Sequence, residues 1–320
     1  MLSRKLKSFF AAIMFLVFVL TTSAVFAEIE NSFADLPEGV VPLTWQPSEK
    51  NLAIKTDEAR KLYDRIKKSD YPSMEELKKS PVVAQLDALS AYYFKVYGNT
   101  ADINTPERRQ LREKVLQEFL SLGSARKISN ATDKKIKYAF DGELKKNYQM
   151  TLVLGLPAVG KSTVYAKPNS EKTGAFILDC DVVKTLLPEY KESFGGASDA
   201  VHIESGNIRN KAMESFLSGD MKGTNIIALI VPTDFDKMMS KYIKPFEAAG
   251  YDVRAVYIDA PENVSFANYI RRELDSGRIY RSSIAASFGN KPKKIYNKLK
   301  NLKNSKGKVY GMGEFKYQKH

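Results

Sequence analysis

The stretch GLPAVGKSTV, residues 155–164, carries the clearest structural signal in this chain. Gly155 to Ser162 fits the pattern G-x-x-x-x-G-K-[ST] of a phosphate-binding loop. A short apolar run, Gln149 to Leu154, precedes the loop and a helix start follows it, as the pattern requires. The two glycines let the backbone turn its N–H groups toward phosphate oxygens, and the helix start adds to this anion site. The chain is therefore predicted to hold a nucleoside triphosphate.

The residues of this loop have expected roles around ATP or GTP. Lys161 is predicted to reach the β- and γ-phosphates, and Ser162 to offer its hydroxyl to Mg²⁺. Both a nucleotide and Mg²⁺ are therefore expected cofactors. The predicted nucleotide-binding residues are Gly155, Leu156, Pro157, Ala158, Val159, Gly160, Lys161, Ser162 and Thr163.

Further along the chain, short apolar runs alternate with amphipathic stretches. The runs lie at residues 149–154, 175–178, 225–231 and 253–258, and the amphipathic stretches at 207–217, 234–249 and 261–274. Strands separated by helices indicate a parallel sheet covered by helices. The predicted fold class is therefore α/β, with a P-loop NTPase-type parallel sheet, flanking helices and a small all-helical N-terminal module.

The chain divides into five predicted segments. These are a signal peptide at 1–27, a helical N-terminal module at 28–123, a linker and first-strand lead-in at 124–148, the P-loop domain at 149–305, and a basic C-terminal tail at 306–320. Within the N-terminal module, the stretches 56–71, 80–98 and 105–123 have helical spacing and helix start or stop residues. They contain no catalytic constellation, so the role of this module is left open.

The first residues resemble an export signal. A basic start with Arg4, Lys5 and Lys7 is followed by the apolar run 9–20 and by small residues before Ala27. Cleavage after Ala27 is predicted, which places the protein in a periplasm or outside the cell, with delivery into another cell as one possibility. The alternative is an uncleaved anchor, because residues 9–27 carry no charge. No other segment could span a membrane, so the mature chain is expected to have no stable membrane span.

The formal net charge of +13 is concentrated at the C-terminal end. Residues 291–320 contain ten lysines and a single acid, Glu314. This end is predicted to meet an acidic partner or nucleic acid, with a solvated helix face as the alternative. Cys180 is the only cysteine, so no intramolecular disulfide can form.

Two carboxylates follow the second apolar run, in the stretch FILDCDVVKTLLPEY at 176–190. Asp179 and Asp181 are expected at the carboxyl edge of the sheet, where ligands bind in open α/β folds. Phosphoryl transfer to a hydroxyl needs a carboxylate close to the γ-phosphate to take the proton. Asp181 is predicted to be that base, and Asp179 to support Mg²⁺, substrate or the loop. The alternative for either residue is a helix cap.

Four stretches resemble, in order, those of the zeta-toxin family of P-loop kinases. They are GLPAVGKST, LDCDVVKTLLPEY, GGASDAVHIESGNI and YIRRELDSGRIYR, and the resemblance covers residues 149–299. It implies phosphorylation of a sugar hydroxyl by ATP or GTP, with UDP-N-acetylglucosamine the best-known acceptor.

The resemblance also implies site residues. Lys161 and Ser162 would hold nucleotide and Mg²⁺, Asp181 would be the base, and Arg272 and Arg278 would stabilise charge on the transferring phosphoryl group. The predicted substrate-binding residues are Asp179, His202, Glu204 and Arg281.

One departure from the family pattern keeps alternatives open. The third apolar run ends in Val231-Pro232-Thr233, where the family commonly has an acid followed by Gly-Thr. The nearest acid, Asp234, is placed later and resembles a helix cap. The leading prediction is a kinase for a small hydroxyl compound such as a UDP-amino-sugar. The alternatives are a polynucleotide 5′-hydroxyl kinase and a nucleotide-binding protein without turnover.

Overall fold

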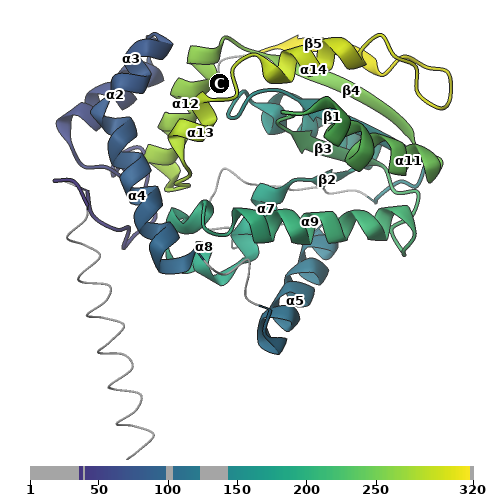
Figure 1. Cartoon of the computed structure of the whole chain (residues 1–320), viewed down its shortest axis with the longest axis horizontal. Coiled ribbons are helices and arrows are strands. Elements are labelled where there is room, and N and C mark those ends of the chain that lie inside the picture. Colours follow the sequence, from purple (N-terminus) through teal and green to yellow (C-terminus); the bar gives the residue numbers. More distant parts are fainter. Residues whose placement is uncertain (1–35, 39, 99–103, 123–142, 318–320) are drawn as a thin grey trace, which may run out of the picture.

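The structure, a computed structural model, describes residues 36–38, 40–98, 104–122 and 143–317 (Figure 1). The predicted signal peptide and most of the predicted linker lie outside these residues. Among the described residues, no helix combines the length and apolar character needed to cross a bilayer.

A five-stranded parallel sheet forms the centre of the molecule (Figure 1). Its order is β2-β3-β1-β4-β5. The strands are β1 (Gln149–Leu154), β2 (Phe176–Leu178), β3 (Ile226–Ile230), β4 (Asp252–Asp259) and β5 (Gly311–Lys316). All pairings are parallel, and β1 lies in the middle with Met150 opposite both Ile226 and Val253. The predicted P-loop NTPase-type sheet is therefore confirmed.

Both faces of the sheet are covered, which explains why its strands read as continuous apolar runs. Met150, Leu152 and Leu154 belong to a core that includes residues of α7 and α9, whereas Val153 lies in a second core with Val159. The helices after β1 are α6 (Lys167–Thr173), α7 (Cys180–Leu186), α8 (Pro188–Glu192), α9 (His202–Leu217), α10 (Phe235–Met238), α11 (Lys244–Ala248), α12 (Glu262–Ser276), α13 (Ser282–Ala286) and α14 (Lys291–Leu299). Two π-helical turns, η1 (Lys161–Ala166) and η3 (Met239–Ile243), and a short 3₁₀ turn, η2 (Gly196–Ser198), complete the set.

The N-terminal helices form as predicted, with one addition. They are α2 (Asp57–Lys67), α4 (Pro81–Tyr97) and α5 (Pro106–Leu122), and the unpredicted α3 (Met74–Lys79). Side-chain caps explain the starts of α2 and α4, because Thr56 and Ser80 each accept a backbone N–H of the first turn.

These helices do not form a separate module, which corrects the predicted boundary at residue 123. Residues of α2 and α4, including Tyr63 and Leu86, share a core with Phe266 and Ile270 of α12. Helix α5 instead joins the core of the sheet, where Phe119 contacts Phe176 of β2 with ring centroids 5.2 Å apart. The predicted segment is helical, but its apolar faces are buried against the P-loop domain and not against each other alone.

The predicted C-terminal tail is also wrong, because residues 311–316 form β5. This strand pairs in parallel with β4, from Ala255 opposite Gly311 to Asp259 opposite Lys316. Two glycines and four exposed residues in six positions make the strand hard to recognise in the sequence, yet an edge strand tolerates both. The P-loop domain therefore extends well past residue 305.

Candidate active site

The phosphate-binding loop leaves β1 at the carboxyl edge of the sheet and leads directly into η1. Gly155 and Gly160 have φ angles of 153° and 84°, which L side chains rarely adopt. A Cβ atom on Gly155 would lie 2.8 Å from the backbone oxygen of Ile258 on β4. The glycines are thus required both for the turn and for its close approach to the neighbouring strand.

Lys161 folds back over its own loop. Its Nζ donates to the backbone oxygens of Gly155, at 3.1 Å, and Leu156, at 2.7 Å. The pKa of Lys161 is lowered to about 8 by burial and by the charge of Arg272, against the opposing effect of the carboxylates of Asp179 and Asp181. A phosphate anion in the loop would therefore stabilise the charged form of this lysine.

Asp179 caps the helix that follows β2. Its Oδ1 accepts the backbone N–H of Asp181 at 2.9 Å, so the chain is not extended through Cys180. The side chains of Asp179, Cys180 and Asp181 have potential ligand atoms within 4.8 Å of one another. Burial raises the pKa of Cys180, which keeps it a thiol and a poor ligand for Mg²⁺. The helix-cap alternative thus applies to Asp179, while its carboxylate still lies beside Asp181.

Asp181 is held by two cations. Its carboxylate forms ion pairs with Lys184, at 3.2 Å, and with Arg278. Burial opposes ionisation, but Arg278, Lys184 and Arg272 together hold the pKa of Asp181 well below its usual value. Asp181 is therefore ionised at neutral pH and can accept a proton. Its basicity is low as long as Arg278 remains in contact.

Arg272 lies beside the same group with its charge uncompensated by an ion pair among the described residues. Its guanidinium lies over the Tyr269 ring, 5.1 Å from the centroid, and its buried Nε has no hydrogen-bond partner there. The charge of Arg272 acts on both Lys161 and Asp181. A partly buried cation at this place is suited to meet an anion between the loop and Asp181.

Arg278 belongs to a loop between α12 and α13. Gly277 ends α12 with a φ angle of 70°, and the Arg278 side chain that follows is only 8% exposed. Arg281 lies further out, where its Nε binds Asp199 at 2.7 Å and half of its side chain is exposed. The structure thus brings Lys161, Asp181, Arg272 and Arg278 together and leaves Arg281 at the rim.

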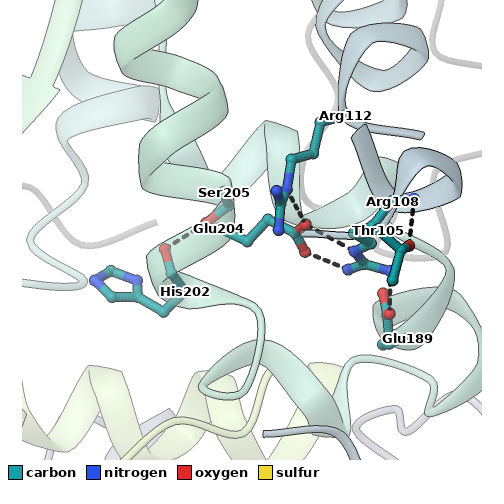
Figure 2. Close-up of polar contacts among 7 residues, drawn as sticks. All are labelled: Thr105, Arg108, Arg112, Glu189, His202, Glu204 and Ser205. Carbon is teal, nitrogen blue, oxygen red and sulfur yellow. Dashed lines mark hydrogen bonds and ion pairs between the residues drawn. The ribbon is translucent and has the colours of Figure 1, made fainter. Parts of the chain in front are cut away.

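The structure separates His202 from Glu204, although both begin α9 (Figure 2). The His202 ring meets the Tyr280 ring edge-on with centroids 5.0 Å apart. Burial and then the charge of Lys184 lower the pKa of His202 to about 3, with Arg209 and Arg281 contributing. His202 is therefore a neutral imidazole on the side of Asp181, which fits a contact residue and not a base.

Glu204 points away from this side, toward α5 (Figure 2). Its buried carboxylate binds Arg108 through two hydrogen bonds and Arg112 through one at 2.7 Å. Arg108 also binds Glu189 at 2.6 Å. The geometry of Glu204 thus does not support the predicted substrate contact, because its carboxylate is hydrogen-bonded to two arginines of α5.

Two features of the site escaped the sequence analysis. Lys184 is buried and pairs with Asp181, a contact that only the spacing of three residues on one helix could have suggested. A cavity of about 290 Å³ opens beside Leu156 of the loop, at the end of β4. Its lining includes Asp259, Glu262 and Lys293, and Lys293 Nζ binds Asp259 at 3.0 Å.

The acid expected by family resemblance at the end of the third strand is absent from this position. β3 ends at Ile230, and Asp234 caps α10 by accepting the Lys237 N–H at 2.7 Å. The prediction that Asp234 is a helix cap is therefore confirmed.

Comparison with known proteins covers the segment that contains the candidate site. The model of the family described as Zeta toxin matches residues 130–307, more than half of the 320-residue chain. The chain belongs to the zeta toxin family. The match includes the phosphate-binding loop, both aspartates and the arginine loop, and the predicted resemblance is confirmed. No curated protein matches the chain.

Solved structures that are similar to parts of this chain come from two systems. One comes from the PezAT chromosomal toxin–antitoxin system of Streptococcus pneumoniae, with 19% identity, a TM-score of 0.41, and coverage of 62% of this chain and 73% of that one. Others are complexes of AvrRxo1-ORF1 with AvrRxo1-ORF2, one with sulphate ions (22% identity, TM-score 0.37, 55% and 52% coverage) and one with ATP (23%, 0.37, 57% and 52%). The chain thus spans about half the length of the AvrRxo1-ORF1:ORF2 chains that it matches.

Proposed function

We propose that this member of the zeta toxin family transfers the γ-phosphate of ATP or GTP to a hydroxyl of a small molecule. The convergence of Lys161, Arg272 and Arg278 on Asp181 carries the proposal. This arrangement places a proton acceptor and three cations at one edge of the sheet, next to the phosphate-binding loop.

Asp181 is the base in this proposal. The acceptor hydroxyl gives its proton to the carboxylate as its oxygen bonds to the γ-phosphorus, and the nucleoside diphosphate leaves with the electrons of the broken P–O bond. Arg272 and Arg278 stabilise the charge that spreads over the equatorial oxygens. For Asp181 to gain basicity, the acceptor or the phosphoryl group must draw Arg278 away from it, since Arg278 lowers the pKa of this carboxyl.

The residues at the site suit Mg²⁺. Ser162 begins η1 directly after Lys161, and the carboxylates of Asp179 and Asp181 lie close together at the end of β2. Hydroxyl and carboxylate oxygens are ligands that Mg²⁺ prefers, and the buried thiol of Cys180 does not compete. The ion would supply charge neutralisation on the phosphates, while the protein residues position the nucleotide and the acceptor.

The cavity beside Leu156 is the proposed place of the nucleotide base. It lies next to the first residues of the loop and is lined by polar groups such as Asp259 and Asn290 that could hydrogen-bond to a purine. This position places the base on the β4 side of β1, and leaves the β2 and β3 side for the acceptor.

An anionic acceptor, such as a UDP-amino-sugar, suits the charges around His202. The cations Lys184, Arg209 and Arg281 all act on His202, and Arg209 has no ion pair within the described parts of the chain. Predicted contacts of His202 and Arg281 with the acceptor remain part of this proposal.

Nucleotide binding without turnover is the second candidate. The end of β3 favours it, because Val231-Pro232-Thr233 supplies no carboxylate to the acceptor side.

Export through the N-terminal segment is likewise proposed and is tested by sequencing the N-terminus of the protein recovered from each compartment of the producing cell.

The test of the proposed function is incubation of the protein with Mg-ATP and a metabolite extract. Mass spectrometry should find a species that gains one phosphate with the unmodified protein and not with Asp181→Asn. Nucleotide binding with no phosphorylated species in extracts that contain nucleotide sugars would favour the second candidate.

A further inference from the structure

The loop that carries Arg278 has no regular structure of its own, yet it is buried. Connecting loops normally lie on the surface. Here Ile279 is fully covered, Arg278 is 8% exposed on its side chain, and Ser282 is inaccessible. The cover comes largely from the N-terminal part of the chain, which precedes the residues matched by the family model.

Residues of the N-terminal part hold the start of this loop. Gln46 Nε2 donates to the backbone oxygen of Ser276 at 2.6 Å, and the Tyr63 hydroxyl donates to Asp275 at 3.3 Å. A Cβ atom on Gly277 would lie 2.9 Å from Pro47 and 2.7 Å from the backbone oxygen of Phe194. The backbone just before Arg278 is therefore enclosed on two sides.

Asp87 of α4 holds the end of the loop. Its Oδ1 accepts the backbone N–H of Ser282 at 2.6 Å and that of Ser283 at 3.4 Å. These are the first two N–H groups of α13, which have no partner within their own helix. Arg281, at the cap position, supplies no side-chain cap to these N–H groups. A distant helix thus provides the cap that the local sequence lacks.

A second contact from the same helix supports the outer arginine. Ser90 lies three residues after Asp87, on the same side of α4. Its hydroxyl donates to Asp199 Oδ2 at 3.3 Å, and Asp199 binds Arg281. Both Ser90 and Asp199 are buried, so their positions are restricted by packing as well.

From these contacts we infer that Asp87 is a positioning residue for Arg278, and that α4 is part of the catalytic unit. By capping α13, Asp87 fixes the far end of a five-residue connection whose near end is held by Gln46. Arg278 is then directed at Asp181 and at the phosphoryl group. The inference rests on the proposed function for its effect on catalysis, but the positioning itself does not depend on turnover.

The experiment compares Asp87→Ala, Asp87→Asn and Asp64→Ala in the full-length protein. Asn at position 87 keeps an oxygen that can accept the two N–H groups, whereas Ala does not. Asp64 is an exposed acid on α2 and serves as the matched control. The steady-state parameters for ATP consumption, ADP affinity by calorimetry, and amide hydrogen exchange of residues 277–286 are measured for each.

Asp87→Ala should lower kcat by about ten- to a hundredfold through misplacement of Arg278, with the affinity for ADP unchanged. Asp87→Asn should recover most of the rate, and Asp64→Ala should match the unmodified protein. Hydrogen exchange of residues 277–286 should rise in Asp87→Ala alone. Unchanged exchange in Asp87→Ala overturns the inference whatever the rates are, and so does an equal defect in Asp87→Asn. Faster exchange in a protein that never turns over would support the positioning and contradict the proposed function.

Discussion

Arg278 and Asp181 form a partly buried ion pair that joins the loop after α12 to the first turn of α7. The pair links the proposed base to the arginine proposed to stabilise the transferring phosphoryl group. Because Arg278 lowers the pKa of Asp181, the two residues cannot be treated as independent parts of the site.

Replacing Arg278 with Ala should affect both rate and pH dependence. Loss of a charge-stabilising arginine should lower kcat by about a thousandfold. The pKa of Asp181 should rise, because the variant lacks the cation that lowers this pKa most, while the burial that raises it remains. The acid limb of the residual pH–rate profile should therefore move to higher pH. Arg281→Ala is the comparison, because Arg281 pairs with Asp199 and not with Asp181. A pH–rate profile of Arg278→Ala identical to that of the unmodified protein would contradict the coupling.

Lys161 should make nucleotide affinity depend on alkaline pH. The folded pKa is lowered to about 8, so the lysine is charged at pH 7 and loses its proton as the pH rises through 8. Bound phosphate favours the charged form, so the Kd for ATP should increase above that pH. Calorimetry between pH 6.5 and 9.5 measures it, and Lys161→Arg should bind with an affinity that stays flat. An equally steep loss in Lys161→Arg would assign the effect to another group.

His202 should reduce stability in acid. Its pKa is about 3 in the folded protein and about 6.5 in an unfolded chain, so the unfolded state binds the proton first. The native state should therefore lose stability as the pH falls from about 6.5 toward 3. His202→Gln should show a smaller loss in urea unfolding across that range. Equal acid sensitivity of the two proteins would show that His202 titrates normally.

The Glu204 network should contribute to stability and not to nucleotide binding. Glu204→Gln weakens hydrogen bonds to Arg108 and Arg112, which should lower the free energy of unfolding by about 1–3 kcal/mol. The Kd for ATP should be unchanged. Glu118→Gln, an exposed change on α5, is the control for urea unfolding and calorimetry. A selective loss of nucleotide or acceptor binding in Glu204→Gln would contradict this prediction and indicate that Glu204 is part of the binding site.

The sequence allowed the first four strands to be predicted because their residues are buried on both faces and therefore form unbroken apolar runs. β5 was not predicted because an exposed edge strand needs no such run, and its two glycines and one lysine resemble a tail. The loop and Asp181 could be placed from local patterns, since a strand, a turn and a helix start fix them. Arg272 and Arg278 needed the family resemblance.

Contacts between distant segments account for the remaining errors. Glu204 could not be separated from His202 in the sequence, because its partner Arg108 belongs to a helix almost a hundred residues earlier. Asp87 carried no signal either, since an acid in a helix is usually solvated, and only the fold brings it to the first N–H groups of α13. The role of the N-terminal helices follows from such contacts and from no motif.

Transfer of label from γ-³²P-ATP to an acid-stable organic product tests the central claim most directly. The unmodified protein should form such a product from a nucleotide-sugar fraction. Asp181→Asn should form it at least about a hundredfold more slowly while still binding ATP. Product formation by Asp181→Asn at the rate of the unmodified protein, or label released only as inorganic phosphate, would contradict the account.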